Sequence, residues 1–153
     1  GIGGFGGLFK LAEYESPILV SSTDGVGTKV LLGLWTGRYE ALGVDLVNAC
    51  LNDVIVTGAD PLFFLDYIAA GKLDPHIIEG LVRGMTKACI QSNCSIVGGE
   101  TAEMPGFYRS GEYDVAGTIL GLVEEERVHL DAHELVVVEV LILRRLTTVS
   151  AKF

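Results

Sequence analysis

PLFFLDYIAAGKLDP, residues 61–75, is the stretch that decides the fold class. Residues 61–70 are apolar and aromatic and predict a β-strand, with Asp66 as the one charge inside it. Asp74 and Pro75 form an N-cap and first-turn pair, which predicts a helix from there to about Asn93. The apolar face of that helix is Ile77, Ile78, Leu81, Val82, Met85, Ala88 and Cys89. A short strand over residues 95–97 follows, so this part of the chain alternates strand, helix and strand, which is typical of an α/β fold.

Further strands and helices are predicted on both sides of this stretch. Residues 17–22 (PILVSS) indicate a short buried strand, and apolar residues at helical spacing predict helices over residues 30–35 and 41–57. On the C-terminal side, residues 113–124 and the β-branched run 134–143 (ELVVVEVLIL) predict two more strands. The chain contains no internal repeat and no linker-like segment.

Composition and charge exclude several functional classes. The chain has 153 residues, 49% of them hydrophobic, and its 11 Lys and Arg against 20 Asp and Glu give a net charge of −9. No basic cluster that could follow a phosphate backbone is present, so we expect no nucleic-acid partner. No apolar run reaches the ~20 residues of a membrane span. The three cysteines, Cys50, Cys89 and Cys94, fit reduced thiols, and we expect a cytoplasmic protein.

One helix carries an unusual polar face. Asp45, Asn48 and Asn52 lie within about 60° of each other on the helix predicted for residues 41–57, with Asp53 beside them. A solvated helix face usually carries long side chains, whereas short carboxylates and amides are poorer helix formers. These side chains are therefore either oxygen ligands for a hydrated divalent cation or an ordinary solvated face.

Two glycine-containing segments follow predicted strands. TDGVGTK, residues 23–29, combines Asp24, two glycines, two hydroxyls and Lys29, which suits phosphate binding through backbone amides and Mg²⁺ binding through an acid. It lacks P-loop spacing, so an ordinary strand-to-helix turn explains it equally well. The second segment, residues 98–106, is predicted as a loop. Its acids, Glu100 and Glu103, are three residues apart, a spacing that suits either metal coordination or a capping role.

Three other patterns favour structural explanations. Residues 1–6 match G-x-G-x-x-G, but no strand precedes them, so we interpret them as a flexible loop or cover. His129 and His133 are spaced i, i+4 without the adjacent glutamate of a zinc motif. Phe63, Phe64 and Tyr67 are expected in a sheet core or a subunit contact.

Taken together, six strings in this order and spacing resemble the phosphoribosylformylglycinamidine cyclo-ligase family, also called aminoimidazole ribonucleotide synthetases. They are GIGGFGG, TDGVGTK, DLVNACLND, DPLFFLDYIAAGKLD, SIVGGETAEMPG and YDVAGTILGLVE. The resemblance covers residues 1–128, and a partial N-terminal domain for ATP binding and dimerisation is expected there. Residues 129–153 depart from the family pattern, apart from the Val140-Leu141-Ile142 match, and are interpreted as an atypical tail.

The resemblance implies an α/β fold of the α+β type: a mixed sheet with helices on one face, which pairs with a second sheet across a homodimer. It also implies a longer parent chain, since a segment before Gly1 and a whole C-terminal domain are missing. ATP would bind in a cleft near the dimer interface, and basic residues that hold the substrate phosphate would belong to the missing parts.

The activity implied by the resemblance is ATP- and Mg²⁺-dependent ring closure of formylglycinamidine ribonucleotide to aminoimidazole ribonucleotide, in purine biosynthesis. It agrees with reading three carboxylates as Mg²⁺ ligands: Asp24, Asp53 and Glu100, with Asp45 as a further candidate. The residues expected to contact nucleotide are Asp24, Gly25, Gly27, Thr28, Lys29, Asp53, Gly98, Gly99 and Glu100. No catalytic residue is predicted.

Two alternatives remain open at this stage. The chain is either an active-site-bearing part of the cyclo-ligase or a catalytically incomplete half that only dimerises, through the strand at residues 61–70, and binds nucleotide weakly or not at all. A sister activity of the same superfamily, such as formylglycinamidine ribonucleotide amidotransfer, is the other alternative.

Overall fold

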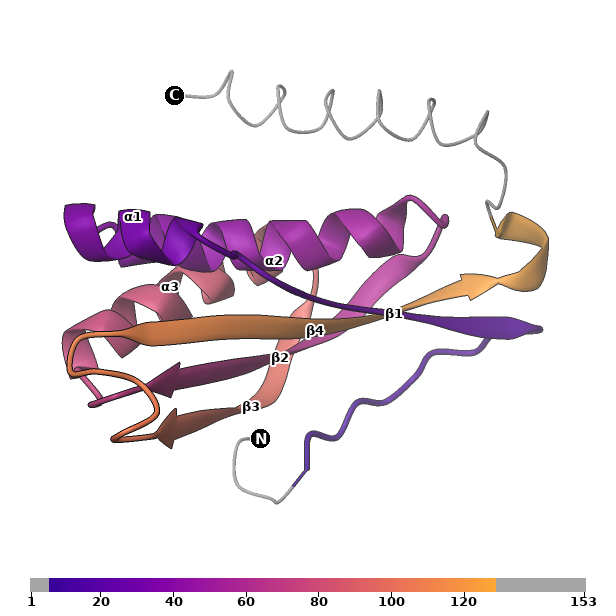
Figure 1. Ribbon diagram of the computed structural model, residues 1–153. Coiled ribbons are helices and arrows are strands. Elements are labelled where there is room, and N and C mark those ends of the chain that lie inside the picture. The colour runs from indigo at the N-terminus through magenta and orange to yellow at the C-terminus, as the bar shows by residue number, and fades with distance from the viewer. Residues whose placement is uncertain (1–5, 129–153) are drawn as a thin grey trace.

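Four strands and three helices build the protein, in a computed structural model that describes residues 6–128. The elements in chain order are β1 (Pro17–Gly25), α1 (Lys29–Thr36), α2 (Tyr39–Ile55), β2 (Asp60–Ala70), α3 (Pro75–Gln91), β3 (Ser95–Glu103) and β4 (Tyr113–Glu124), followed by the 3₁₀ turn η1 (Glu125–Arg127). The strands form one sheet, and the three helices lie together on one of its faces (Figure 1). This arrangement confirms the predicted α/β fold with helices on one face.

The sheet is mixed, as the resemblance implied. Its strand order is β1-β4-β2-β3, and only β2 and β3 are parallel, while β4 runs antiparallel to both β1 and β2. The parallel pair is joined by α3, so the stretch that decided the fold class forms a strand-helix-strand unit. Because β2 lies between β4 and β3, it has no free edge, and a subunit contact through residues 61–70 can involve only its side chains.

Alternate residues of β2 point to opposite faces of the sheet, one covered by the helices and one without helices. Phe64 and Ile68 are fully buried beneath the helices, in one cluster with Ile119 of β4, Leu46 of α2 and Leu81 of α3. Leu65 and Tyr67, each one residue from a buried position, point to the other face of the sheet, as the period of two along a strand requires. Leu65, which the sequence places in a buried strand, is therefore only half-buried.

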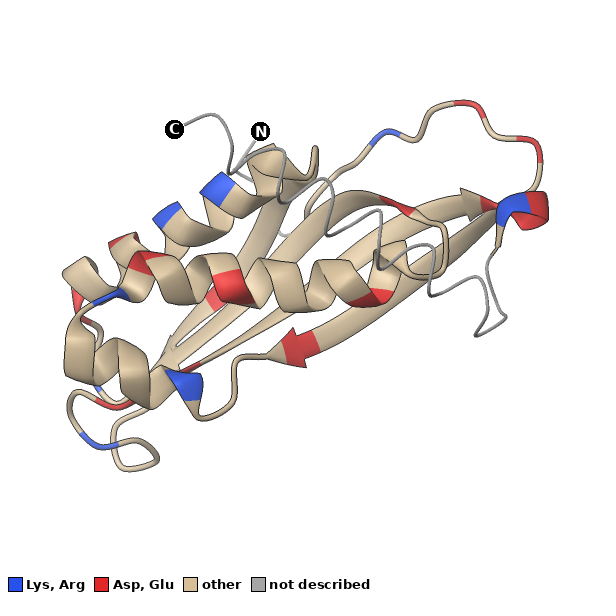
Figure 2. Cartoon of the chain, turned by 90° about the horizontal axis from the view of Figure 1, so that it is seen from above, with Lys and Arg blue, Asp and Glu red and all other residues tan. Residues whose placement is uncertain are grey.

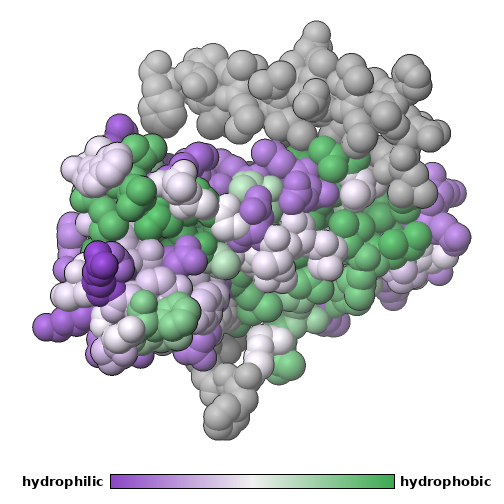
Figure 3. Space-filling model, in the orientation of Figure 1, coloured by the Kyte–Doolittle hydropathy of each residue, from purple (hydrophilic) through white to green (hydrophobic). Residues whose placement is uncertain are grey.

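The open face is the sheet face without helices. Tyr67 is 39% exposed there and Leu19 is 62% exposed, and the apolar colour in Figure 3 is prominent over β1 and β4. The segment before β1 contacts part of this face, since the ring of Phe9 lies 5.5 Å from that of Phe63. Phe64 in the core, with Phe63 and Tyr67 on this face, agrees with the expectation of a sheet core or subunit contact.

Glycines allow α2 and α3 to pack closely. A Cβ on Gly43 of α2 would lie 2.1 Å from the carbonyl oxygen of Leu81, and one on Gly84 of α3 would lie 2.0 Å from that of Glu40. These contacts involve rigid backbone on both sides, so a larger residue would force the helices apart. At the start of α3, the Asp74 side chain accepts a hydrogen bond from the His76 backbone N–H at 2.9 Å, which confirms the predicted N-cap.

Two predicted boundaries are wrong. The strand predicted over residues 17–22 runs on to Gly25, and it is largely exposed and not buried, because it is an edge strand paired only with β4. The loop predicted over residues 98–106 is strand as far as Glu103, because parallel pairing with β2 continues through Gly98 and Gly99. The strand predicted over 134–143, residues 1–5 of the glycine-rich start, and both His129 and His133 lie outside the described residues.

Candidate functional site

The first part of the candidate site lies where β1 ends and α1 begins. Asp24 is exposed near the end of β1, where its Oδ1 accepts the Gly25 backbone N–H at 2.7 Å. Only residues 26–28 then separate the strand from the helix, and Gly27 has a φ of +52°, a conformation that favours glycine. Lys29 opens α1, whose first turn holds no acidic residue. Because the helix begins directly after this short connection, its positive end faces the same region as Asp24.

Helix α2 brings a second carboxylate to this junction. Ser22, which shares a face of β1 with Asp24, donates a hydrogen bond from its Oγ to Oδ2 of Asp53 at 2.7 Å. The Asp53 side chain is thereby held toward β1 from the last turns of α2, and it remains exposed to solvent. The structure therefore brings Asp24 and Asp53, from two elements far apart in sequence, to one side of the sheet.

Cys50 lies beneath these two carboxylates. Its Sγ donates to the Gly117 carbonyl at 3.4 Å, and its side chain is fully buried. Burial raises the pKa of the Cys50 thiol, and the negative charges of Asp24 and Asp53 raise the pKa further. The same thiol therefore responds to the charges of both carboxylates.

Lys29 and Asp45 form an ion pair at the edge of the same region, with 3.2 Å between Nζ and Oδ2. Their side chains are about half exposed, at 57% and 47%, so the pair contributes little to stability and can separate for a ligand. Around this region the carboxylates Asp24, Asp45 and Asp53 outnumber the one lysine, Lys29, and Figure 2 shows the acidic positions of α2 along the helix layer. An anionic nucleotide in this region would need a cation as an intermediary.

The third predicted carboxylate lies elsewhere. Glu100, with Gly98 and Gly99, belongs to β3, and β4 and β2 separate that strand from β1 in the sheet. Glu100 pairs with Tyr67 in register, which places it on the open face of the sheet, while Asp53 comes from the helix side. Within residues 6–128, no group of three His, Cys, Asp or Glu side chains is close enough to hold a metal ion. One protomer therefore does not bring all three predicted Mg²⁺ ligands together.

Two acids near β3, Glu103 and Asp66, contact the backbone or a glycine of a neighbouring segment. Glu103 accepts the Leu73 backbone N–H at 2.7 Å and so ties the turn after β2 to the end of β3, while the N-cap of α3 is Asp74. Asp66 of β2 is half-buried beside Gly99, and burial raises the pKa of its carboxyl group. A Cβ on Gly99 would lie 2.2 Å from Asp66 Oδ1, so this glycine is needed for close approach.

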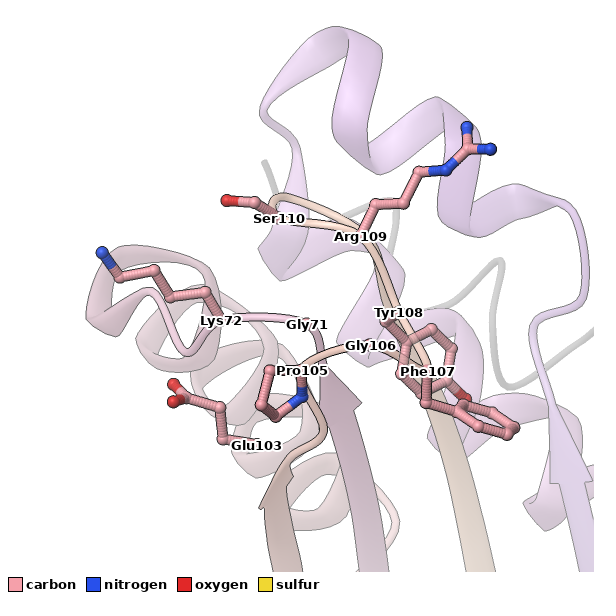
Figure 4. A pocket seen from close by; sticks show the side chains of 9 residues that line it. All are labelled: Gly71, Lys72, Glu103, Pro105, Gly106, Phe107, Tyr108, Arg109 and Ser110. Atoms are coloured by element: carbon pink, nitrogen blue, oxygen red, sulfur yellow. The ribbon is translucent and has the colours of Figure 1, made fainter.

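A shallow pocket of about 690 Å³ lies at the carboxyl ends of the parallel strands β2 and β3. It lies between the β2–α3 turn, with Gly71 and Lys72, and the loop from Pro105 to Ser110. Figure 4 shows that Lys72 and Arg109 project to opposite sides of it, while Phe107 and Tyr108 lie together. The carboxyl ends of parallel strands are a common place for ligands in α/β sheets.

Sequence reasoning missed two features of this region. Ser22 was not singled out, although its position two residues before Asp24 on a strand puts both on one face. The pocket was missed as well, and the Gly71-Lys72 pair directly after the strongest strand was the signal for it. No helix of residues 6–128 is long and apolar enough to cross a bilayer.

Comparison with known proteins identifies the family. The family described as "AIR synthase related protein, N-terminal domain" matches residues 9–123. The chain is 56% identical over 129 residues to the phosphoribosylformylglycinamidine cyclo-ligase of Trichlorobacter lovleyi and 55% identical to that of Geobacter sulfurreducens. In both cases the match covers 83% of this chain and 37% of the relative.

Solved structures share the fold at lower identity. Thiamine-monophosphate kinase from Stenotrophomonas maltophilia matches with a TM-score of 0.64 and 20% identity, over 77% of this chain and 35% of the kinase. Hydrogenase maturation protein HypE in complex with ATP matches with a TM-score of 0.58 and 21% identity, over 79% of this chain and 34% of that chain. At these identities the likeness establishes the fold alone.

The chain spans a little over a third of the length of the curated relatives that it matches. The six strings that carried the resemblance lie within or close to the matched residues 9–123. The family match over residues 9–123 agrees with the mixed sheet and its layer of helices. The chain belongs to the AIR synthase related protein family and contains that family's N-terminal domain.

Proposed function

We propose that the protein to which this chain belongs catalyses the ATP- and Mg²⁺-dependent closure of formylglycinamidine ribonucleotide to aminoimidazole ribonucleotide. The observation that carries the proposal is the placement of Asp24 and Asp53 together beside the start of α1. The names of the curated relatives support the substrate, and the ATP named with HypE supports nucleotide binding by this fold. We propose a cytoplasmic location as well.

In this ring closure the formyl oxygen of the substrate must become a leaving group. Transfer of the γ-phosphoryl group of ATP to the formyl oxygen allows a neighbouring nitrogen to close the imidazole ring and expel phosphate. When bound, Mg²⁺ neutralises charge on the transferred phosphoryl group. Asp24 and Asp53 would hold that cation, because carboxylate oxygens are its preferred protein ligands. Lys29 and the backbone N–H groups of residues 27–29 would face phosphate oxygens.

We propose further that two protomers complete the nucleotide site. Glu100 lies on the open face of β3, and Asp24 lies at the other edge of the same sheet. If two open faces pack about a two-fold axis parallel to the strands, β3 of one protomer lies over β1 of its partner. Burial of the exposed side chains of Leu19 and Tyr67 would favour this homodimer. Because β1 is an edge strand, Glu100 would then lie beside the edge at which the partner's Asp24 and Asp53 lie on the helix side, and it would complete the site around that edge.

Calorimetric titration of the 153-residue chain with ATP, with and without Mg²⁺, tests the nucleotide site. We expect Mg²⁺-dependent binding that Asp53→Asn weakens by about 1–3 kcal/mol, the scale of a lost charge-assisted contact. Asp60→Asn is the matched control. Asp60 is an exposed aspartate at the start of β2, and its nearest charged partner is Arg127 at 3.9 Å.

The outcomes separate the readings of the chain. Equal binding by the wild type and both variants removes Asp53 from the site. No binding by a folded wild-type chain favours the other reading, in which this chain is a catalytically incomplete half. The sister amidotransferase reading is tested in the parent chain, where ATP turnover that rises with formylglycinamidine ribonucleotide alone, without an amide donor, would exclude it.

A further inference from the structure

Two cysteines meet where α3 ends. The Cys94 backbone N–H donates to the carbonyl oxygen of Cys89 at 2.8 Å, and the Asn93 N–H donates to that of Ile90 at 3.3 Å. Asn93 between them has a φ of +55°, in the left-handed region. These bonds form a Schellman C-cap, in which the side chains of the two positions occupied by Cys89 and Cys94 touch.

The backbone bond fixes how far apart the two cysteines lie. With the nitrogen of Cys94 at 2.8 Å from the oxygen of Cys89, standard bond lengths limit their Cα separation to about 6.7 Å. A disulfide requires a Cα separation of about 4.4–6.8 Å, so the cap holds this pair within bonding range without any movement of the helix. The two thiols are also close enough for each to shift the pKa of the other.

The two thiols differ in a way that suits stepwise oxidation. Cys89 is 2% exposed and Cys94 is 7% exposed, so Cys94 is the more accessible. The interaction between the two side chains raises the pKa of Cys89 and lowers that of Cys94. Cys94 is thus the thiol that loses its proton more readily and that an oxidant meets first. Cys50 differs, because its Sγ hydrogen bond goes to the Gly117 carbonyl.

We propose that Cys89 and Cys94 are a covalent modification site, a dithiol that hydroperoxides convert reversibly to an intrachain disulfide. The Cys94 thiolate attacks a peroxide oxygen, which forms an S–O bond and breaks the O–O bond to release hydroxide. Cys89 sulfur then attacks the Cys94 sulfenic acid, and its proton leaves with the departing oxygen as water. Two thiols are oxidised, and hydrogen peroxide is reduced to two waters. This inference does not depend on the proposed ligase function.

Peptide mapping of the native chain tests the proposal directly. The chain is treated with a small excess of hydrogen peroxide, unreacted thiols are alkylated under denaturing conditions, and trypsin is added without reductant. Cleavage after Lys87 and Arg109 leaves residues 88–109 as one peptide with both cysteines, while Cys50 falls in residues 39–72. We expect peptide 88–109 about 2 Da lighter and unalkylated, and Cys50 fully alkylated. Dithiothreitol should restore two alkylation sites in peptide 88–109.

Controls keep the outcome clear. Cys50→Ser should leave the oxidation unchanged, and Cys89→Ser should abolish the disulfide while Cys94 still reacts. If a serine variant does not fold, the peptide map of the wild-type chain alone shows whether the Cys89–Cys94 disulfide forms. Full alkylation of both cysteines in peptide 88–109 after peroxide would overturn the proposal. A disulfide joining residues 39–72 to residues 88–109, or one that forms only in denaturant, would overturn it as well.

Discussion

Tyr113, at the start of β4, is a residue whose ionisation is coupled to folding. It is 5% exposed, and its hydroxyl donates to the Val30 carbonyl of α1 at 3.4 Å. Burial, with a smaller effect of Tyr39, raises the pKa of Tyr113 to about 12. The folded state therefore favours the protonated phenol, and the stability that depends on it is present below pH 10 and is lost as the pH rises toward 12.

The expected loss is about 2–3 kcal/mol of unfolding free energy between pH 10 and pH 12, from a shift of roughly two pKa units. Urea unfolding at both pH values measures it. In Tyr113→Phe the loss over the same interval should be smaller by that amount, because the other tyrosines titrate alike in both proteins. An identical pH dependence of the unfolding free energy in the two proteins would show that ionisation of Tyr113 is not coupled to unfolding.

Single residues also show which parts of the site can be predicted from the sequence alone. Asp24 and Asp53 were both predicted as site residues from residue type and position, and the structure brings them together because β1 and α2 pack side by side. Ser22 follows from the period of two along β1 and was missed, whereas the separation of Glu100 from the two aspartates depends on strand order, which a single sequence does not specify. The role of the three carboxylates as one set of Mg²⁺ ligands stays a prediction.

Among the elements, the α2–α3 contact is the most sensitive to side-chain size. We expect Gly84→Ala to destabilise the protein by about 1–3 kcal/mol, because its Cβ would lie 2.0 Å from the Glu40 carbonyl oxygen. The better helix propensity of alanine offsets only part of this cost. Urea unfolding measures the effect, and Gly6→Ala, which has nothing within 4 Å of its Cβ, is the control. An unchanged midpoint for Gly84→Ala would contradict the close helix contact.

The two faces of β2 give a second prediction at this scale. Phe64→Ala should cost about 3–5 kcal/mol, because the ring is fully buried beneath the helices. Leu65→Ala, one residue further on the open face, should cost distinctly less in a monomer. Urea unfolding at a protein concentration where the chain is monomeric compares the two variants. Equal losses would contradict the assignment of Leu65 to a solvent-facing side of the sheet.

Elements were predicted better than their ends. Each helix and strand of the described residues was expected from periodicity and caps, because α2 and α3 have strong apolar faces and Asp74 and Pro75 mark a helix start. The ends of β1 and β3 were misjudged because glycines usually interrupt strands. Here Gly98 and Gly99 continue one by parallel pairing with Leu65 and Asp66 of β2, and Asp66 occupies the space that a side chain on Gly99 would fill.

For the whole molecule, we expect the open face to govern assembly. Its exposed apolar residues predict that the chain is a dimer at tens of micromolar, and sedimentation measures this directly. Tyr67→Lys should shift the population to monomer, because a charge would be buried in the interface. Lys87→Glu on α3, on the opposite side of the sheet, should leave the dimer intact. A monomeric wild-type chain would remove the basis for a shared site.

The most direct test of the shared nucleotide site is a mixing experiment. Asp53→Asn and Glu100→Gln chains are unfolded together, refolded as a mixture and titrated with Mg²⁺ and ATP beside each variant alone. If one protomer supplies Asp53 and its partner supplies Glu100, each mixed dimer has one intact site, and the mixture regains about a quarter of the wild-type sites. If both residues serve a site within one protomer, every site in the mixture carries one substitution. The mixture would then bind no better than the variants, which would contradict the shared site.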